Sequence, residues 1–124
     1  MIAADSDVLI DALRGVDPSC SRVRDAIRDG VLLTTAVTAF ELLAGAREEK
    51  ERDRVEALLG PLEVLPLDAN SAAAAAEIHR DLASRGQTIG MADSLIAGIC
   101  RSRSVAVLTR NVAHFERVPG LRLA

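Results

Sequence analysis

Acidic and amide side chains recur in this chain beside short apolar runs that read as strands. Asp5 follows the first apolar run, Glu41 lies in the helical segment after the second, and Asp93 lies near the start of a later helical segment. Asn111 follows the last long apolar run. Carboxylate and amide oxygens are the ligands that a hard cation such as Mg²⁺ or Mn²⁺ takes. If the fold brings these side chains to one edge, they predict a divalent-metal site.

Each of these side chains also has a structural interpretation. Asp5, or either of the next two residues, can be the N-cap of a first helix. The segment Thr38–Glu41 matches the capping box S/T-x-x-E, which would give Glu41 a structural role. Asp93 would interact favourably with the dipole at the start of its helix, and Asn111 could stabilise the turn in which it lies. No single position therefore identifies a metal site, and only the four positions taken together favour one.

The composition limits how the chain could hold a nucleic acid. Its net charge is −3, and its only lysine is Lys50, so nearly every cation is an arginine. Arginine binds phosphate in a bidentate manner, but charge alone would not hold a nucleic acid here. The only aromatic residues are Phe40 and Phe115, too few for a base-stacking platform. We expect any nucleic acid to be held by backbone contacts or through metal.

The length and the apolar pattern predict one domain over residues 1–124 and no membrane association. A chain of 124 residues with 49% hydrophobic content suits a single core. No run approaches the roughly 18 apolar residues of a membrane helix, and no basic leader precedes "MIAADSD". Cys20 and Cys100 form no CxxC pair, so neither zinc nor a disulfide framework is expected. We expect a soluble, cytoplasmic protein.

Strand-like and helix-like segments alternate along the chain. Strands are predicted at 1–5, 31–35, 62–67 and 105–109, with a possible fifth at 121–124, and helices at 7–15, 19–30, 38–60, 70–86 and 91–102. This alternation predicts an α/β fold, a three-layer α/β/α domain with a mostly parallel sheet of four to five strands. Ligands of such sheets bind outside the carboxyl ends of the strands, where the acids are expected.

Four separated motifs carry a resemblance to a known family. "DSDVLID" near the amino terminus, "TAFELLAG" near residue 40, "GMADSLIAGI" near residue 90 and "VLTRNVAHFERVPGL" at the end occur in this order. Together they resemble the PIN-domain ribonucleases, in particular the VapC-type toxins of bacterial toxin-antitoxin pairs. The resemblance covers essentially the whole chain, so it implies a PIN-like fold throughout.

The resemblance implies a role for individual positions. Asp5, Glu41 and Asp93 match the acidic metal site, and Asn111 stands where many members place a fourth acid or a polar substitute. Small hydroxyl positions beside this site are matched by Ser6 and Thr109. Two positions depart from the pattern: Asp7 stands where asparagine is common, and His114 stands where some members have an acid. The number of metal ions, one or two, is therefore open.

The implied activity is that of an endoribonuclease that leaves a 5′-phosphate and a 3′-hydroxyl. A divalent cation would activate a water for attack on the phosphodiester, with no protein nucleophile. The implied partners are an RNA substrate and a VapB-like antitoxin. A homodimer is expected as well, because apolar faces such as "FELLAG" and "LLGPLEVL" could make the contact between two copies. The candidates for steering the RNA backbone are Arg14, Arg47, Arg85 and Arg110. Any of these could instead be a solvated arginine, and Asp11, three residues before Arg14, is expected to be its surface partner.

Two rival classes remain open from the residues alone. "DSD" after a strand also matches the haloacid dehalogenase-like phosphatases, where Asp5 would be the nucleophile, but their chemistry calls for a well-placed lysine. A non-catalytic interaction module would use the same acids as helix caps. No nucleotide cofactor is expected, because neither GxGxxG nor a GK[ST] loop is present.

Overall fold

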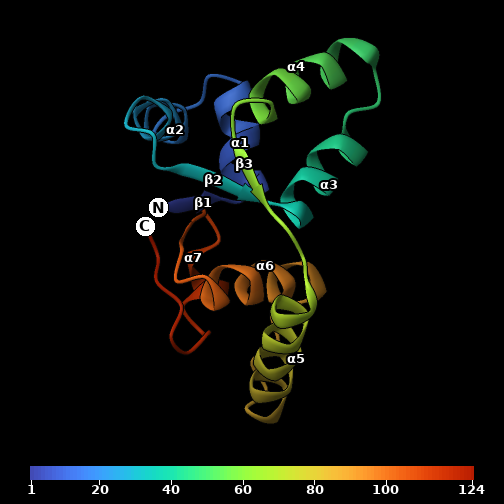
Figure 1. Ribbon diagram of the computed structural model, residues 1–124, viewed down its shortest axis with the longest axis vertical. Coiled ribbons are helices and arrows are strands. Elements are labelled where there is room, and N and C mark those ends of the chain that lie inside the picture. Colours follow the sequence, from blue (N-terminus) through green and yellow to red (C-terminus); the bar gives the residue numbers. More distant parts are fainter.

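Four short strands form one parallel sheet at the centre of the molecule. The computed structural model describes residues 1–124, and the strands are β1 (Ile2–Ala4), β2 (Leu32–Thr35), β3 (Glu63–Leu65) and β4 (Ala106–Leu108). Their order in the sheet is β3-β2-β1-β4, and every pairing is parallel (Figure 1). Ile2 of the central strand β1 is in register with Leu32 on one side and Ala106 on the other. The predicted parallel α/β architecture is confirmed.

Seven helices surround the sheet. They are α1 (Ser6–Leu13), α2 (Ser19–Arg28), α3 (Ala36–Gly45), α4 (Glu49–Leu59), α5 (Ala69–Ser84), α6 (Met91–Ser102) and the short α7 (Val112–Phe115). Figure 1 shows α1 to α4 grouped around one side of the sheet, while α5 and α6 lie on the other. No helix combines the length and the hydropathy of a membrane-spanning segment.

Two hydrophobic cores, one on each face of the sheet, hold the three layers together. Side chains of α5 and α6, among them Ile78 and Ile96, pack with Ala3 and Val107 in one core. The second core packs side chains of α1 to α4 against the other face, with Leu9 at its centre. Neighbouring residues of one strand point to opposite faces, so even a strand of three residues contributes to both cores. The sheet is therefore covered on both sides, as the near-continuous apolar strands indicate.

The alanine-rich helix α5 packs unusually close to α6. A Cβ placed on Gly98 of α6 would lie 2.7 Å from the Cβ of Ala75 and 2.7 Å from the carbonyl oxygen of Ser71. Such a separation leaves no room for a methyl group. The small residues of the two helices therefore set how closely α6 approaches α5, and α6 carries one of the candidate acids.

The structure corrects three sequence-based expectations of secondary structure. The predicted helix over 38–60 is two helices, α3 and α4, separated at Ala46–Glu48. The fifth strand at 121–124 is only a single bridge between Val107 and Leu123. The capping box at Thr38–Glu41 does not form, because α3 begins earlier: Thr35 is its N-cap and accepts a hydrogen bond from the backbone N–H of Thr38.

Candidate functional site

Asp5 sits where β1 passes into α1, at the carboxyl end of the central strand. It is the N-cap of α1, and its Oδ1 accepts a hydrogen bond of 2.8 Å from the backbone N–H of Ser6. Its Oδ2 accepts a 2.9 Å bond from the hydroxyl of Thr109, which directly follows β4. Only 6% of Asp5 is exposed. Asp5 is thus both a helix cap and a buried carboxylate fixed across two neighbouring strands.

Asp7 connects α1 to the loop after β4. Its Oδ1 accepts from the backbone N–H of Val8 at 2.7 Å, and its Oδ2 accepts from the backbone N–H of Arg110 at 3.1 Å. The Thr109 hydroxyl lies 3.4 Å from the same Oδ2. These bonds give Asp7 a positioning role, since they tie together the two segments that hold Asp5.

Glu41 enters the site from α3, where the charges of Asp93 and Asp7 act on its carboxyl group. Because Thr35 caps this helix, Glu41 lies in its second turn and not in the first turn that the sequence suggested. Its Oε1 is buried without any hydrogen-bond partner, which is unusual because a buried carboxylate oxygen is normally paired. The geometry therefore leaves Glu41 with an oxygen that is free to bind a ligand.

Asp93 lies in the first turn of α6, as predicted. The chain enters this helix at Gly90, whose φ of +90° is a conformation that L side chains rarely adopt. The Oδ2 of Asp93 is 2.8 Å from Nδ1 of His114 and 3.3 Å from Nδ2 of Asn111. Asn111 therefore lies beside the acids, as its position after β4 suggests.

The carboxyl groups of this cluster influence one another. Burial raises the pKa of Asp5 to about 6, and the charges of Asp7 and, to a lesser extent, Asp93 act in the same direction. Hydrogen bonds from the Ser6 N–H and the Thr109 hydroxyl favour the charged form and offset part of this rise. Burial also raises the pKa of Glu41, followed by the charge of Asp93, while the Ser6 hydroxyl favours the charged form. Asp93 thus acts electrostatically on both other acids, so the three form one site.

The donor atoms of this site suit a hard divalent cation. Asp5, Glu41 and Asp93 present carboxylate oxygens from three different elements, and the unpartnered Oε1 of Glu41 is available as a ligand. As placed, however, no three His, Cys, Asp or Glu side chains form a ready-made metal-binding group. Like charges repel, and a cation would lower the cost of bringing these carboxylates closer. The chemistry of these donors therefore fits a divalent metal ion, provided that their side chains move closer together.

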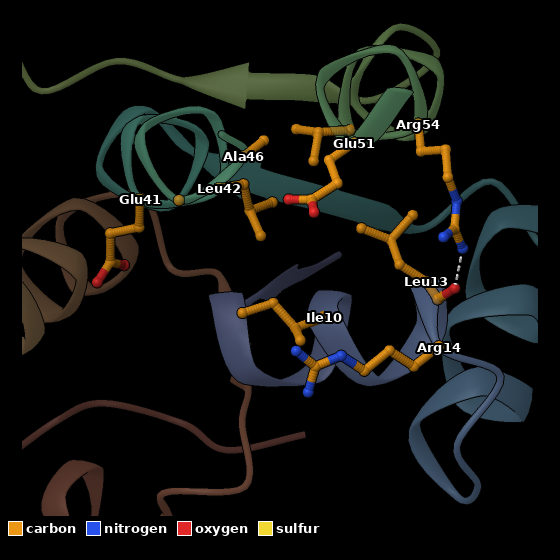
Figure 2. Close-up of a pocket in the computed structure, with 10 residues that line it drawn as sticks. Ile10, Leu13, Arg14, Glu41, Leu42, Ala46, Glu51 and Arg54 are labelled. Atoms are coloured by element: carbon orange, nitrogen blue, oxygen red, sulfur yellow. Dashed lines mark hydrogen bonds between the residues drawn. The ribbon is translucent and has the colours of Figure 1, made fainter. Parts of the chain in front are cut away.

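A pocket of about 300 Å³ opens next to Glu41, between α1, α3 and α4. Figure 2 shows Glu41 at one end of this pocket, with Arg14 and Arg54 toward the other. The Arg54 guanidinium donates to the carbonyl oxygen of Leu13, and the walls include Leu42. The pocket is thus a partly apolar depression that also holds two arginines and the Glu51 carboxylate.

The four predicted RNA-binding arginines are not equally near the acids. Arg14 lines the pocket beside Glu41, and the backbone of Arg110 contacts Asp7. Arg47 follows α3, and its carbonyl oxygen accepts a bond from Arg52. Arg85 is the C-cap of α5, where it pairs with Asp81 at 2.6 Å. Figure 1 shows α5 on the other side of the sheet from α3. The structure places Arg110 beside the acids and Arg14 toward the far end of the adjoining pocket, and it leaves Arg85 outside both.

Two contacts near the site were not anticipated from the sequence. Asp11 is not the solvated partner of Arg14: it is buried, and its Oδ2 lies 3.1 Å from Nε of Arg110 and 3.2 Å from the Ser19 hydroxyl. The contact of His114 with Asp93 was also missed. Each of these two contacts joins residues that are far apart in the sequence. The only sequence feature that pointed to one of them was His114, which stands where some members of the family have an acid.

Comparisons with known proteins agree with this geometry. A family model described as "PIN domain" matches residues 2–121. The chain is 33% identical to "tRNA(fMet)-specific endonuclease VapC" of Shigella flexneri, over 95% of this chain and 92% of the relative. It is 36% identical to "Ribonuclease VapC10" of Mycobacterium tuberculosis H37Rv, over 98% and 91%.

Solved structures show the same fold. The DNA-bound VapBC complex from Salmonella typhimurium contains a chain that superposes with a TM-score of 0.85 at 30% identity, covering 99% of this chain and 96% of that one. A chain of the VapBC2 complex from Rickettsia felis gives a TM-score of 0.89 at 22% identity, over 100% and 98%. The second likeness concerns the fold alone.

Proposed function

The chain belongs to the PIN-domain family of VapC-type ribonucleases, and we propose that Asp5, Glu41 and Asp93 form a Mg²⁺- or Mn²⁺-binding site at which it cleaves RNA. The observation that carries the proposal is that three elements distant in the sequence direct carboxylates to the carboxyl ends of the central strands. The raised pKa values of Asp5 and Glu41 support it, because they reflect carboxyl groups that are buried first of all and that neighbouring acids also repel.

A bound divalent cation supplies a water of lowered pKa and stabilises negative charge on the phosphate and the leaving oxygen. The residues of the chain provide the geometry for this. Hydrogen bonds from Ser6 and Thr109 fix the two oxygens of Asp5, and each oxygen keeps a lone pair for the cation. Asp5, Glu41 and Asp93 would bind the cation, and Asn111 would orient Asp93. The P–O3′ bond breaks, which leaves a 5′-phosphate and a 3′-hydroxyl.

The pocket beside Glu41 is the proposed path of the RNA away from the scissile phosphate. Arg14 and Arg54 lie at its far end (Figure 2) and would contact backbone phosphates, while its apolar walls would face sugars or bases. Arg110 would act near the acids, because its backbone and side chain lie between Asp7 and Asp11. Arg47 and Arg85 are weaker candidates for binding RNA, because neither lines the pocket or contacts an acid of the site.

A VapB-like antitoxin and a second copy of the chain are the proposed protein partners. The solved neighbours named above are VapBC toxin-antitoxin complexes, which supports an antitoxin partner for this chain as well. For the homodimer, the support is an apolar depression formed by α3, the β3–α5 connection and α6, where Phe40 is 70% exposed and Met91 is 78% exposed. Groups this large and apolar on a surface favour a protein contact.

The phosphatase alternative lacks its required lysine. Lys50, the only lysine, is exposed in the first turn of α4, on a different helix from the acids. The second alternative, a non-catalytic interaction module, would use Asp5 only as a helix cap. Asp5 does cap α1, but a capping role is compatible with catalysis and does not favour this alternative.

The experiment is cleavage of RNA by the purified protein with Mn²⁺ and with a chelator, beside Asp5→Asn and Asp93→Asn. Both variants keep the size of the side chain, so the fold should be retained, as circular dichroism can check. Asp25→Asn is the matched control, because that side chain is about half exposed (48%) on α2. We expect metal-dependent cleavage by the native protein and the control, with a loss of at least about 100-fold in the two site variants, equivalent to about 2.7 kcal/mol. Equal cleavage by all four proteins would refute the proposal.

A further inference from the structure

His114 contacts one of the acids of the proposed metal site through a ring nitrogen. Its Nδ1 lies 2.8 Å from Oδ2 of Asp93, so the short helix α7, which carries His114, is joined to the first turn of α6. The side chain of Asp93 is 20% exposed and that of His114 is 37% exposed. The pair therefore lies at the edge of the site, where a change in one side chain is felt by the other.

The chemistry of the two groups decides which atom carries the proton. An ionised carboxylate can only accept, so the 2.8 Å separation requires a hydrogen on Nδ1 of His114. Nδ2 of Asn111 lies 2.8 Å from this nitrogen and 3.3 Å from the same oxygen of Asp93. If the amide donated to Nδ1, two acceptors would face each other and the stronger, charge-assisted bond to the carboxylate would be lost. His114 therefore donates to Asp93, and Asn111 is a second, more distant donor to the same oxygen.

These two donors engage only one oxygen of Asp93. Oδ2 accepts from His114 and Asn111, whereas Oδ1 has no hydrogen-bond partner in the chain. Oδ1 is also not buried, because Oε1 of Glu41 is the only buried side-chain oxygen or nitrogen without a partner. The protein thus holds one oxygen of this carboxylate and leaves the other open to a ligand.

We propose that His114 is a positioning residue of the metal site, which fixes the Asp93 carboxylate through Nδ1–H so that Oδ1 is available to the cation. The inference rests on the proposed function, since it takes Asp93 as a metal ligand. Carboxylates that bind metal ions are commonly held by such hydrogen bonds, and loss of the partner weakens metal binding by about 10–100-fold. A histidine at this position also adds no negative charge to acids that already repel one another.

The first test measures Mn²⁺ binding by calorimetry, with the full chain and without RNA. Asparagine and leucine both branch at Cγ and are similar in size, but only His114→Asn keeps a nitrogen donor at the place of Nδ1. We expect Mn²⁺ affinity to fall at least about tenfold in His114→Leu and to remain close to the native value in His114→Asn. The only other histidine, His79, is exposed on α5, so His79→Leu is the matched control and should bind Mn²⁺ as the native chain does.

The second test locates the proton in the metal-free chain. Nitrogen-15 nuclear magnetic resonance of labelled histidine distinguishes an Nδ1–H from an Nε2–H imidazole at about pH 8, where an ordinary histidine is neutral. The spectrum of His79→Leu contains the signals of His114 alone. We expect the Nδ1–H form for His114, and the Nε2–H form would overturn the inference, because Nδ1 would then have no hydrogen to donate to Asp93.

The outcomes separate this inference from the proposed function. Equal weakening of Mn²⁺ binding in His114→Leu and His114→Asn would overturn the inference, because the packing of the ring and not its donor would then matter. Native affinity in His114→Leu would overturn it as well. If the expected pattern appears but the native chain does not cleave RNA, the inference holds and the proposed function fails, whereas a native chain that binds no Mn²⁺ would overturn both.

The comparison does not depend on the fold of one variant. Circular dichroism checks that His114→Leu is folded. Should it unfold, the Nδ1–H form in the native fold together with near-native Mn²⁺ affinity in His114→Asn would support the inference, and weakened binding in a folded His114→Asn would overturn it.

Discussion

Replacing Asp5 by asparagine should stabilise the metal-free protein while it abolishes cleavage. The carboxyl is buried, and burial together with the charge of Asp7 raises its pKa from the ordinary 3.8 to about 6. The folded chain therefore binds this proton more tightly than the unfolded chain does. Stability should fall as the pH rises from about 4 to about 6, and above pH 6 the full cost of the buried charge is present.

The magnitude follows from the pKa. A rise from 3.8 to about 6 corresponds to about 3 kcal/mol at neutral pH. Asparagine keeps most of the local bonds, since it is also a good N-cap for α1, and its amide can meet the Thr109 hydroxyl. We therefore expect a gain of about 1–3 kcal/mol. With an unfolding entropy of about 2.1 cal/mol/K per residue, this raises the Tm by about 4–12 °C.

The assay is thermal unfolding with a chelator at pH 7.5 and at pH 4. The gain should be large at pH 7.5 and nearly absent at pH 4, where the native Asp5 is protonated. Asp17→Asn is the control of opposite sign: hydrogen bonds from the Ser21 hydroxyl and N–H lower the pKa of this exposed carboxyl, so its charged form is favourable. A Tm for Asp5→Asn equal to or below that of the native protein at pH 7.5 would refute the electrostatic argument.

Three further substitutions test other parts of the structure. Thr109→Val removes a buried hydroxyl that donates to Asp5 and accepts from the backbone N–H of Asn111. We expect the free energy of unfolding in denaturant to fall by about 1–3 kcal/mol and cleavage to slow, and Thr109→Ser should restore both. Unchanged stability of Thr109→Val would argue against a structural role for this hydroxyl. Gly98→Ala forces a methyl group against Ala75 and Ser71 and should lower stability by about 1–3 kcal/mol; unchanged urea unfolding would show that α5 and α6 can separate freely. Leu67→Asp places a charge in the apolar depression of the proposed dimer, so sedimentation should show a shift from dimer to monomer, and an unchanged dimer would place the contact elsewhere.

The sequence allowed the sheet and the position of the acids to be predicted because both depend on local patterns. Apolar strands alternating with helical segments predict a parallel sheet, and residues after such strands must lie at its carboxyl edge. Asp5 and Asn111 follow this rule in the structure, and Asp93, at the start of α6, contacts Asn111. The start of α3 was misplaced because Thr35 and Thr38 are both good caps, and only the end of β2 selects Thr35.

Contacts between distant residues could not be predicted in this way. The pairing of Asp11 with Arg110 joins α1 to the loop after β4, and it depends on the neighbouring positions of β1 and β4 in the sheet. The i,i+3 spacing favoured Arg14 instead, since a local pattern contains no information on the neighbouring loop. The same holds for His114, whose ring reaches Asp93 only because α7 folds back beside α6.

The most direct test of the account is the fate of the water oxygen during cleavage. RNA is cut by the purified protein with Mn²⁺ in water enriched in oxygen-18, and the product ends are analysed by mass spectrometry. The account predicts one heavy oxygen in each new 5′-phosphate, a free 3′-hydroxyl, and no products with a chelator or with Asp93→Asn. Products that carry a 5′-hydroxyl and a 2′,3′-cyclic phosphate would contradict it, because the attacking group would then be the 2′-hydroxyl of the RNA and not water.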